Sequence, residues 1–163
     1  MSAGSKLSPV WFPLLAPGNH CTTSEADDKY NCIAWAAGHQ DKHWWPDEDG
    51  IGFWPINRRE ETIECFVSAF ESLGYEPCPN DDPAFEAGCE KVAIFAKGNE
   101  PTHAALQKVN GRWTSKMGTE GEDIEHDWGV LDGPSYGRAV RVLRRLNGRV
   151  APPGGQVTPI RGA

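Results

Sequence analysis

The residues best suited to chemistry in this chain are Cys32 and His103, which lie about 70 positions apart. The apolar, Ala-rich stretch 30–38 predicts a short helix with Cys32 in its first turn. The unpaired N–H groups at a helix N-terminus stabilise a thiolate, so this position favours a cysteine nucleophile. His103 follows a predicted turn and opens a strand, which suits a general base at the edge of a sheet. The pair predicts a cysteine-dependent enzyme.

A third side chain is needed to orient the imidazole, and the strand next to His103 is its nearest source. Ser115, on the predicted strand 112–116, is our candidate for this role. A hydroxyl carries no charge, so serine orients an imidazole less firmly than a carboxylate or an amide does. Three alternatives therefore stay open, namely Gln107, Asp123 and His126.

Contacts to the substrate and to the oxyanion are expected around the start of the same helix. The backbone N–H of Cys32 is the natural oxyanion donor, with the side chains of Asn31 and Tyr30 as further donors. The stretch 39–57 is rich in Trp, Pro, Asp and Gly, and a long ordered loop of this kind can wall a cleft. The predicted cleft wall consists of Trp44, Trp45 and Trp54.

Structural roles compete with these assignments. Most cysteines in globular domains behave as small buried apolar residues, and we assign three other cysteines to the core: Cys65, Cys78 and Cys89. A lone histidine at a strand end is commonly structural, so the role of His103 depends on that of Cys32. The spacings of the remaining His and Cys residues match no usual zinc ligand pair, so no metal and no cofactor is expected.

A helical layer must pack on a sheet to bring Cys32 close to His103. In the stretch 58–73 the apolar residues recur at helical spacing and predict an amphipathic helix that ends before Gly74. The second half changes to strand-like patterns at 91–96, 102–109 and 112–116, which predict three antiparallel strands, with one more at 139–144. We therefore predict a single α+β domain over residues 1–146, with N-terminal helices on a C-terminal antiparallel sheet. The Pro- and Gly-rich stretch 147–163 is predicted to be a flexible tail.

Composition narrows the range of partners and compartments. The 163 residues carry a formal charge of −7, and such a field repels nucleic acid and anionic lipid, so neither is an expected partner. Basic residues gather near the end of the chain but lack interleaved aromatic residues, which favours a solvated face. No signal peptide or membrane-length apolar stretch is present, and five cysteines without C-x-x-C pairing suit a reducing compartment. We expect a cytoplasmic protein, and export without a signal peptide stays open.

The order of the candidate residues resembles that of papain-like cysteine peptidases and, in compact form, that of the NlpC/P60 and CHAP amidase families. Helix-borne Cys32 comes first, then His103-Ala104-Ala105-Leu106, then Trp113-Thr114-Ser115-Lys116. The segments 30–36, 102–105 and 113–118 are also similar to a group of uncharacterised bacterial proteins of this size. Peptidoglycan amidases typically present Asp-Cys-Ser at the nucleophile and His, Asn, Glu or Gln at the third position. Asn31-Cys32-Ile33 and Ser115 depart from that pattern, and these departures concern the substrate more than the fold.

The resemblance implies a papain-like fold and a hydrolase of the thiol protease or amidase type without a cofactor. We expect hydrolysis or acyl transfer at an amide bond through a thioester on Cys32, with a peptide or another amide-containing molecule, including a protein, as substrate. Two alternatives remain. A glutamine deamidase or transglutaminase-type effector would use the same dyad, and a non-catalytic acidic binding or inhibitory protein would bury Cys32 on the same fold.

Overall fold

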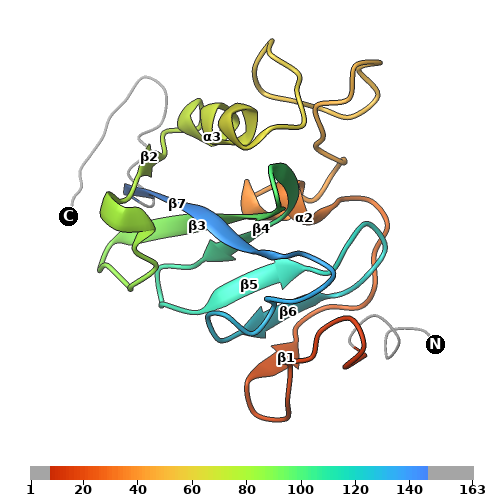
Figure 1. Ribbon diagram of the computed structural model, residues 1–163, viewed down its shortest axis with the longest axis vertical. Coiled ribbons are helices and arrows are strands. Elements are labelled where there is room, and N and C mark those ends of the chain that lie inside the picture. The colour runs from red at the N-terminus through yellow and green to blue at the C-terminus, as the bar shows by residue number, and fades with distance from the viewer. Residues whose placement is uncertain (1–7, 147–163) are drawn as a thin grey trace.

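The computed structural model describes residues 8–146, in which seven strands form one antiparallel sheet (Figure 1). The strands are β1 His20–Thr22, β2 Glu76–Pro77, β3 Cys89–Lys97, β4 Glu100–Gln107, β5 Trp113–Lys116, β6 Asp123–His126 and β7 Arg138–Leu146. Their order across the sheet is β1-β6-β5-β4-β3-β7-β2. The described part of the chain also has two α-helices, α2 Cys32–Ala36 and α3 Ile63–Glu71, and a 3-10 helix, η1 Pro79–Asp81.

Helix α3 forms where the sequence pattern places a helix, because both its start and its packing face are specified locally. The Thr62 hydroxyl accepts a hydrogen bond from the backbone N–H of Cys65 at 3.2 Å and thereby caps the first turn. Phe66 and Phe70, in the middle of the apolar stripe, are fully buried. The helix therefore lies with one face on the sheet, as the ribbon shows (Figure 1).

The sheet buries a separate hydrophobic cluster on each of its faces. Alternation along the strands sends Val92, Ile94 and Ala104 toward helices α2 and α3. The intervening Ala93 and Ala105 point the other way, into a second cluster. That second cluster also contains Phe12, Cys78, Phe95, Trp113, Met117, Ile124, Leu131 and Val142. The central strands are thus buried on both sides.

The predicted antiparallel sheet is confirmed, but the molecule is mainly β and has less helix than the α+β prediction implies. The expected strands appear as β3, β4, β5 and β7, and the sheet gains β1, β2 and β6, which the sequence pattern did not indicate. The helices of the described residues have only five and nine residues. The predicted tail 147–163 lies outside the described residues.

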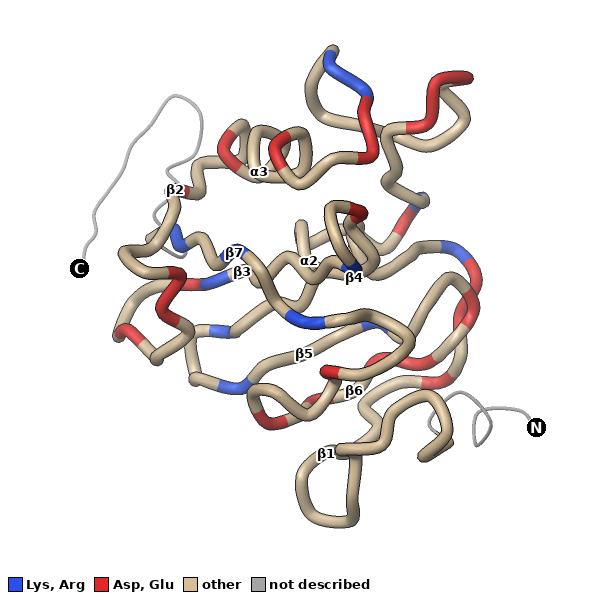
Figure 2. Tube along the Cα trace, in the orientation of Figure 1, with Lys and Arg blue, Asp and Glu red and all other residues tan. Residues whose placement is uncertain are grey.

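Charged residues are dispersed along the chain, with acidic residues mostly on the loops (Figure 2). Two of the four arginines of β7 form ion pairs: Arg144 contacts Glu86 at 2.8 Å, and Arg145 contacts Glu90 at 3.1 Å. These pairs reduce the positive potential along this strand.

Within residues 8–146, no helix combines the length and the apolar character needed to cross a membrane.

Candidate functional site

Cys32 is the first residue of α2, and Asn31 fixes that helix start. The Asn31 side-chain oxygen accepts hydrogen bonds from the backbone N–H groups of Ala34 at 3.1 Å and of Trp44 at 3.0 Å. Its amide nitrogen donates to the Trp44 carbonyl at 2.8 Å. Asn31 therefore caps the helix and connects α2 to the loop of residues 39–57, which we call the aromatic loop. Its side chain thus has a structural task at the place where we expected an oxyanion donor.

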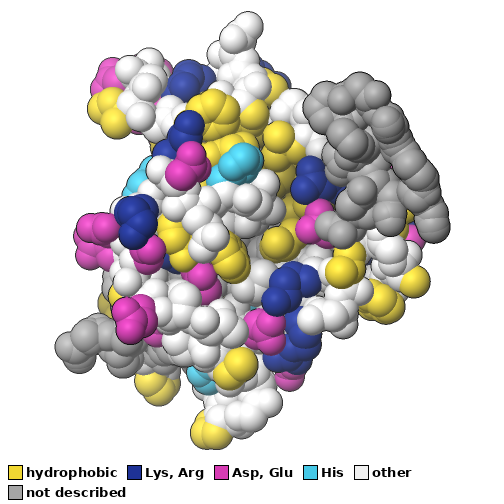
Figure 3. Space-filling model, turned by 180° about the vertical axis from the view of Figure 1, so that it is seen from behind, with side chains coloured by type: hydrophobic (Ala, Val, Ile, Leu, Met, Phe, Trp, Pro, Cys, Tyr) yellow, Lys and Arg dark blue, Asp and Glu magenta, His cyan; other side chains and the backbone are white. Residues whose placement is uncertain are grey.

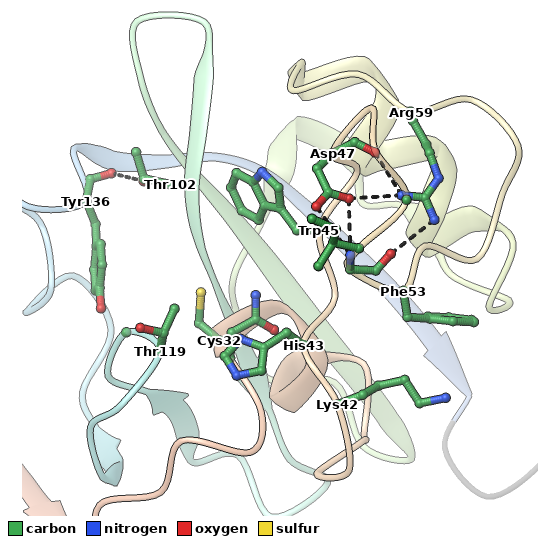
Figure 4. Close-up of a pocket in the computed structure, with 15 residues that line it drawn as sticks. Cys32, Lys42, His43, Trp45, Asp47, Phe53, Arg59, Thr102, Thr119 and Tyr136 are labelled. Carbon is green, nitrogen blue, oxygen red and sulfur yellow. Dashed lines mark hydrogen bonds and ion pairs between the residues drawn. The ribbon is translucent and has the colours of Figure 1, made fainter.

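The Cys32 side chain lines a cleft of about 980 Å³ between the aromatic loop and the two loops that carry Thr119 and Tyr136. On the back of the molecule, hydrophobic side chains gather in a hollow edged by basic residues and a histidine (Figure 3). In close-up, the Cys32 sulfur lies at the centre of the cleft, with Tyr136 and Thr119 on one side and Trp45 on the other (Figure 4). Only 6% of the Cys32 surface is exposed, so the thiol forms part of a deep floor.

The Cys32 thiol is protonated at neutral pH. Burial raises its pKa to about 11, against the backbone N–H groups of Ala104, Cys32 and Ile33 and the charge of Lys116, all of which lower it. The sequence predicted the opposite direction from the helix N-terminus alone. That prediction is wrong because the helix has only five residues and desolvation of the thiolate outweighs its N–H groups.

His103 is completely buried, and its ring is enclosed by aromatic side chains. The Tyr136 ring stacks on it at a centroid distance of 3.9 Å with an interplanar angle of 8°, and Phe95 approaches edge-on at 5.3 Å. Burial lowers the pKa of His103 well below 6.5, and the nearby His126 lowers it further. The imidazole is therefore neutral at pH 7. Its Nδ1 atom is buried without a hydrogen-bond partner.

Cys32 and His103 belong to opposite faces of the sheet, and His103 does not line the cleft that Cys32 lines. Cys32 packs in the cluster that contains Ala104, whereas His103 follows Ala105 into the other cluster. Strands β4 and β5 pair only at Leu106 with Thr114 and at Gln107 with Trp113, so the ladder stops short of His103.

Two observations place the thiol near neighbours of His103. The Ala104 N–H, next to His103 in the chain, lowers the Cys32 pKa. Tyr136, which stacks on His103, lines the cleft together with Cys32. Among the described residues no hydrogen bond joins the Cys32 sulfur to an imidazole.

The sequence-based third residue lies beside the imidazole. The Ser115 hydroxyl is 3.0 Å from His103 Nε2 and 2.8 Å from His126 Nε2, so it links the two rings. His126 Nδ1 in turn lies 3.0 Å from the Asp127 carbonyl oxygen. The candidate Ser115 and the alternative His126 thus form one chain of hydrogen bonds behind His103.

The other proposed polar residues are engaged elsewhere. Gln107, four residues beyond His103 on β4, has its Nε2 atom 3.3 Å from the Gly111 carbonyl. Asp123 accepts hydrogen bonds from the Tyr30 hydroxyl through both carboxylate oxygens, at 3.0 and 2.9 Å. Tyr30 is therefore not free to serve an oxyanion, which corrects that expectation, and burial raises the pKa of Asp123.

The aromatic loop does wall the cleft, although only one of its tryptophans takes part. Trp45 lines the cleft, whereas Trp44 and Trp54 are buried in the core and do not line it. The exposed wall comes instead from Ile51 and Phe53. Trp44 and Trp54 were expected at the surface of the cleft because residue type alone does not separate a wall residue from a core residue.

An ion pair holds the far side of this loop in place. Arg59 donates to the Asp47 carboxylate at 3.2 Å and to the Gly52 carbonyl at 3.1 Å (Figure 4). The Asp47 carboxylate also accepts from the Gly52 N–H at 3.1 Å. These bonds neutralise the two charged side chains within the wall.

Sequence reasoning missed three residues around the thiol: Tyr136, His43 and Lys116. Tyr136 lies in a tight loop closed by reciprocal backbone bonds between Gly133 and Gly137. Gly137 has a φ of 73°, and an added Cβ would collide with the Ala96 carbonyl, so only glycine fits there. The two closely spaced glycines were the only signal in the sequence for this loop.

His43 and Lys116 place an imidazole and a buried cation near Cys32. His43 lines the cleft, and its Nε2 lies 2.8 Å from the Asp28 carbonyl. Lys116 is fully buried, with its ammonium 4.9 Å from the centre of the Tyr30 ring. Across residues 8–146, no group of three His, Cys, Asp or Glu side chains converges as metal ligands would.

Comparison with known proteins places this mainly β chain in a family. A family model described as a domain of unknown function (DUF7689) matches residues 21–144, and the chain belongs to this family. The matched range includes α2, the aromatic loop and the whole hydrogen-bonded chain behind His103. No curated protein and no solved structure matches the chain.

Proposed function

We propose that this protein is a cysteine-dependent hydrolase or acyl transferase that acts on amide bonds through a thioester on Cys32. The observation that carries the proposal is the buried, unpartnered Nδ1 of a neutral His103, in the region where Cys32 forms the floor of a cleft. A buried acceptor without a partner costs free energy and calls for an explanation, and a catalytic task is one such explanation. The order of helix-borne Cys32, strand-borne His103 and Ser115 on the next strand supports a papain-like, NlpC/P60-like relationship.

In the proposed reaction both groups begin neutral. As the Cys32 sulfur forms a bond to the substrate carbonyl carbon, its proton passes to His103, and the carbonyl π electrons move to the oxygen. The C–N bond then breaks, the electron pair goes to the leaving amine, and the His103 proton is delivered to that amine. Water attacks the thioester with His103 as base and regenerates the thiol. The Cys32 N–H is the proposed oxyanion donor.

The first step requires the sulfur and the imidazole to approach each other more closely than they do without a substrate. Catalytic hydrogen bonds are often long in free enzymes and shorten in the complex. The incomplete pairing of β4 and β5 supports this view, since His103 has a ladder partner on β3, Phe95, but none on β5.

The walls of the cleft indicate the kind of acyl group that would bind. Trp45, Ile51, Phe53 and Tyr136 offer apolar surface, and the Asp47–Arg59 pair is internally neutralised. Burial of an apolar chain against such walls contributes roughly 25 cal/mol per Å². We therefore propose an acyl segment with a large apolar side chain or chain, without a requirement for charge.

An activated ester provides the test. Wild-type protein is mixed with p-nitrophenyl hexanoate and p-nitrophenyl acetate, nitrophenol release is followed, and the acylated peptide is identified by mass spectrometry. We expect a burst, an acyl group on Cys32, and faster acylation by the hexanoate. Cys21→Ser removes the exposed cysteine outside the cleft and is the matched control, whereas Cys32→Ser is expected to remove the burst. Acylation confined to other residues would refute the proposal.

The second nucleophile decides between hydrolysis and transfer. Addition of a primary amine to the acylated protein would yield an amide if the protein is a transglutaminase-type enzyme, and a glutamine substrate would release ammonia if it is a deamidase. Water alone would turn over the thioester in a peptidase or amidase. The same acylated protein therefore separates these activities.

A non-catalytic binding protein is the second candidate function. The protonated, largely buried thiol of Cys32 favours it, because such a cysteine contributes to the floor of an apolar cleft without reacting. A protein of this kind would bind an apolar ligand, with Cys32→Ala and wild-type affinities alike. The ester experiment separates the two candidates directly.

A further inference from the structure

The hydrogen-bonded chain behind His103 is ordered in one direction by its last member. His126 Nδ1 lies 3.0 Å from the backbone carbonyl of Asp127, and a carbonyl oxygen can only accept. His126 Nδ1 must therefore carry the hydrogen. Burial lowers the pKa of His126 to about 4, so the ring is neutral at pH 7 and its Nε2 is an acceptor.

This assignment propagates through Ser115 to His103. Ser115 has one hydrogen, and it must donate that hydrogen to His126 Nε2 at 2.8 Å, because that nitrogen carries none. The Ser115 oxygen can then only accept in its 3.0 Å contact with His103 Nε2. His103 Nε2 therefore bears the hydrogen. In a neutral ring the other nitrogen, Nδ1, keeps its lone pair, and this is the atom that has no partner.

We propose that His126 is a positioning residue that, through Ser115, holds His103 in the tautomer whose Nδ1 is free to accept a proton. The role in catalysis rests on the proposed function, whereas the tautomers of His103 and His126 can be measured without any activity. A serine alone could donate to His103 or accept from it, and would leave both tautomers open. His126 removes that freedom, which explains how an uncharged hydroxyl can occupy the place that a carboxylate or an amide commonly fills.

The surroundings of His126 suit this task. It lies on β6 opposite His20 in register and faces Trp113 on β5, and only 2% of its surface is exposed. Burial has the largest effect on its pKa; Asp127 raises this pKa, whereas Arg112 and His20 lower it. The chain thus ends at a rigid backbone carbonyl and not at a mobile side chain.

Nitrogen-15 NMR of the full chain at pH 7 tests the proposal, because protonated and unprotonated imidazole nitrogens have well-separated shifts. We expect hydrogen on Nδ1 of His126 and on Nε2 of His103. Hydrogen on Nδ1 of His103 in the wild-type protein would overturn the proposal, whatever the activity.

Two variants sharpen the test. In His126→Phe the Ser115 hydroxyl is released and can either accept from or donate to His103 Nε2, so the Nδ1–H form of His103 is expected to appear beside the Nε2–H form. His20→Phe, which replaces the cross-strand neighbour outside the chain of bonds, is the matched control and should leave His103 unchanged. An unchanged His103 tautomer in folded His126→Phe would also overturn the proposal. Should His126→Phe fail to fold, Ser115→Ala replaces it, and mixed His103 tautomers are expected.

Activity separates this inference from the proposed function. With p-nitrophenyl hexanoate, His126→Phe is expected to slow acylation of Cys32 by about 10²-fold, the lower end of a general-base contribution, with the control near wild type. If Cys32 is acylated in neither the wild type nor the variants while the wild-type tautomers are as expected, the proposed function fails and the tautomer assignment stands. If acylation occurs and is equal in folded His126→Phe and wild type, the positioning role is refuted.

Discussion

The helix side of the sheet and its opposite side treat polar groups in contrasting ways. On the helix side, Cys32 lies in an apolar cleft with its thiol protonated and open to a ligand. On the opposite side, His103, Ser115 and His126 form a closed hydrogen-bonded chain in which the one unsatisfied ring nitrogen is His103 Nδ1. One side offers a nucleophile to which no described imidazole is hydrogen-bonded, and the other offers a base that does not line the cleft. We propose that the two combine beside the part of β4 that does not pair with β5.

Replacement of the base should give the largest effect. His103→Gln keeps a polar side chain of similar size but removes the proton acceptor, and acylation of Cys32 by p-nitrophenyl hexanoate is expected to fall by about 10²–10⁴-fold. The matched control is His43→Gln, which changes the imidazole that lines the cleft itself. A large loss in His43→Gln with little loss in His103→Gln would transfer the role of base to the cleft side.

Acid should lower the stability of the side of the sheet that carries His126. The pKa of His126 falls from 6.5 to about 4 on folding, so the unfolded chain binds more protons between these values and the free energy of unfolding decreases as pH drops through them. The shift corresponds to about 3 kcal/mol at 1.36 kcal/mol per pKa unit, fully lost near pH 4.

Urea denaturation of wild type and His126→Gln from pH 7 to pH 4 measures this term. The difference in free energy of unfolding between the two proteins is expected to shrink by about 3 kcal/mol as pH falls. Parallel curves would show that His126 is not buried in its neutral form.

The helix side depends most on Asn31, which makes three hydrogen bonds to Ala34 and Trp44. Asn31→Ala removes a helix cap and leaves buried backbone groups of Trp44 unpaired, so a loss of about 2 kcal/mol is expected by denaturation. Asn19 makes bonds of the same kind to Ala16 and Leu14 at an exposed loop, so Asn19→Ala is a matched control with an expected cost below about 1 kcal/mol. Equal costs would show that Asn31 does not anchor the cleft.

The smallest effect is expected at the cleft wall. Arg59→Met breaks the bonds to Asp47 and Gly52 that hold the loop, and should raise the KM for the hexanoate ester a few-fold, equivalent to about 1 kcal/mol, with little change in kcat. The control is Arg58→Met, at the neighbouring position, which breaks a surface ion pair with Glu60. A fall in kcat for Arg59→Met would mean that the wall also positions the reacting groups.

The sequence predicted what local patterns can encode. The stripe around Phe66 and Phe70 predicted α3, and the runs around Ile94 and Ala104 predicted the central hairpin, because periodicity follows from which face is buried. The short strand β6 was not predicted because its four residues are mostly polar. Its residues Ile124 and His126 point inward only because Ser115 and Trp113 lie opposite them. Cross-strand register is a property of the folded sheet and not of the segment.

The chemistry of the site was less predictable than its residues. Cys32, His103 and Ser115 were selected from the order and type of residues, but the depth of Cys32 reversed the expected shift of its pKa. Burial depth depends on Trp45, Tyr136 and the rest of the cleft, which lie far apart in sequence. Tyr136 in particular comes from a loop between two glycines, where no periodic pattern marks a residue that stacks on His103.

The most direct test of the account is the pH dependence of Cys32 alkylation by iodoacetamide in wild type and His103→Gln, with exposed Cys21 as internal reference. If His103 takes the proton as the new S–C bond forms, Cys32 in the wild type will react near neutral pH much faster than a thiol of pKa about 11 allows, and His103→Gln will lose that advantage. If Cys32 instead follows a pKa of about 11 equally in both proteins, sulfur and imidazole do not cooperate, and the catalytic account is contradicted.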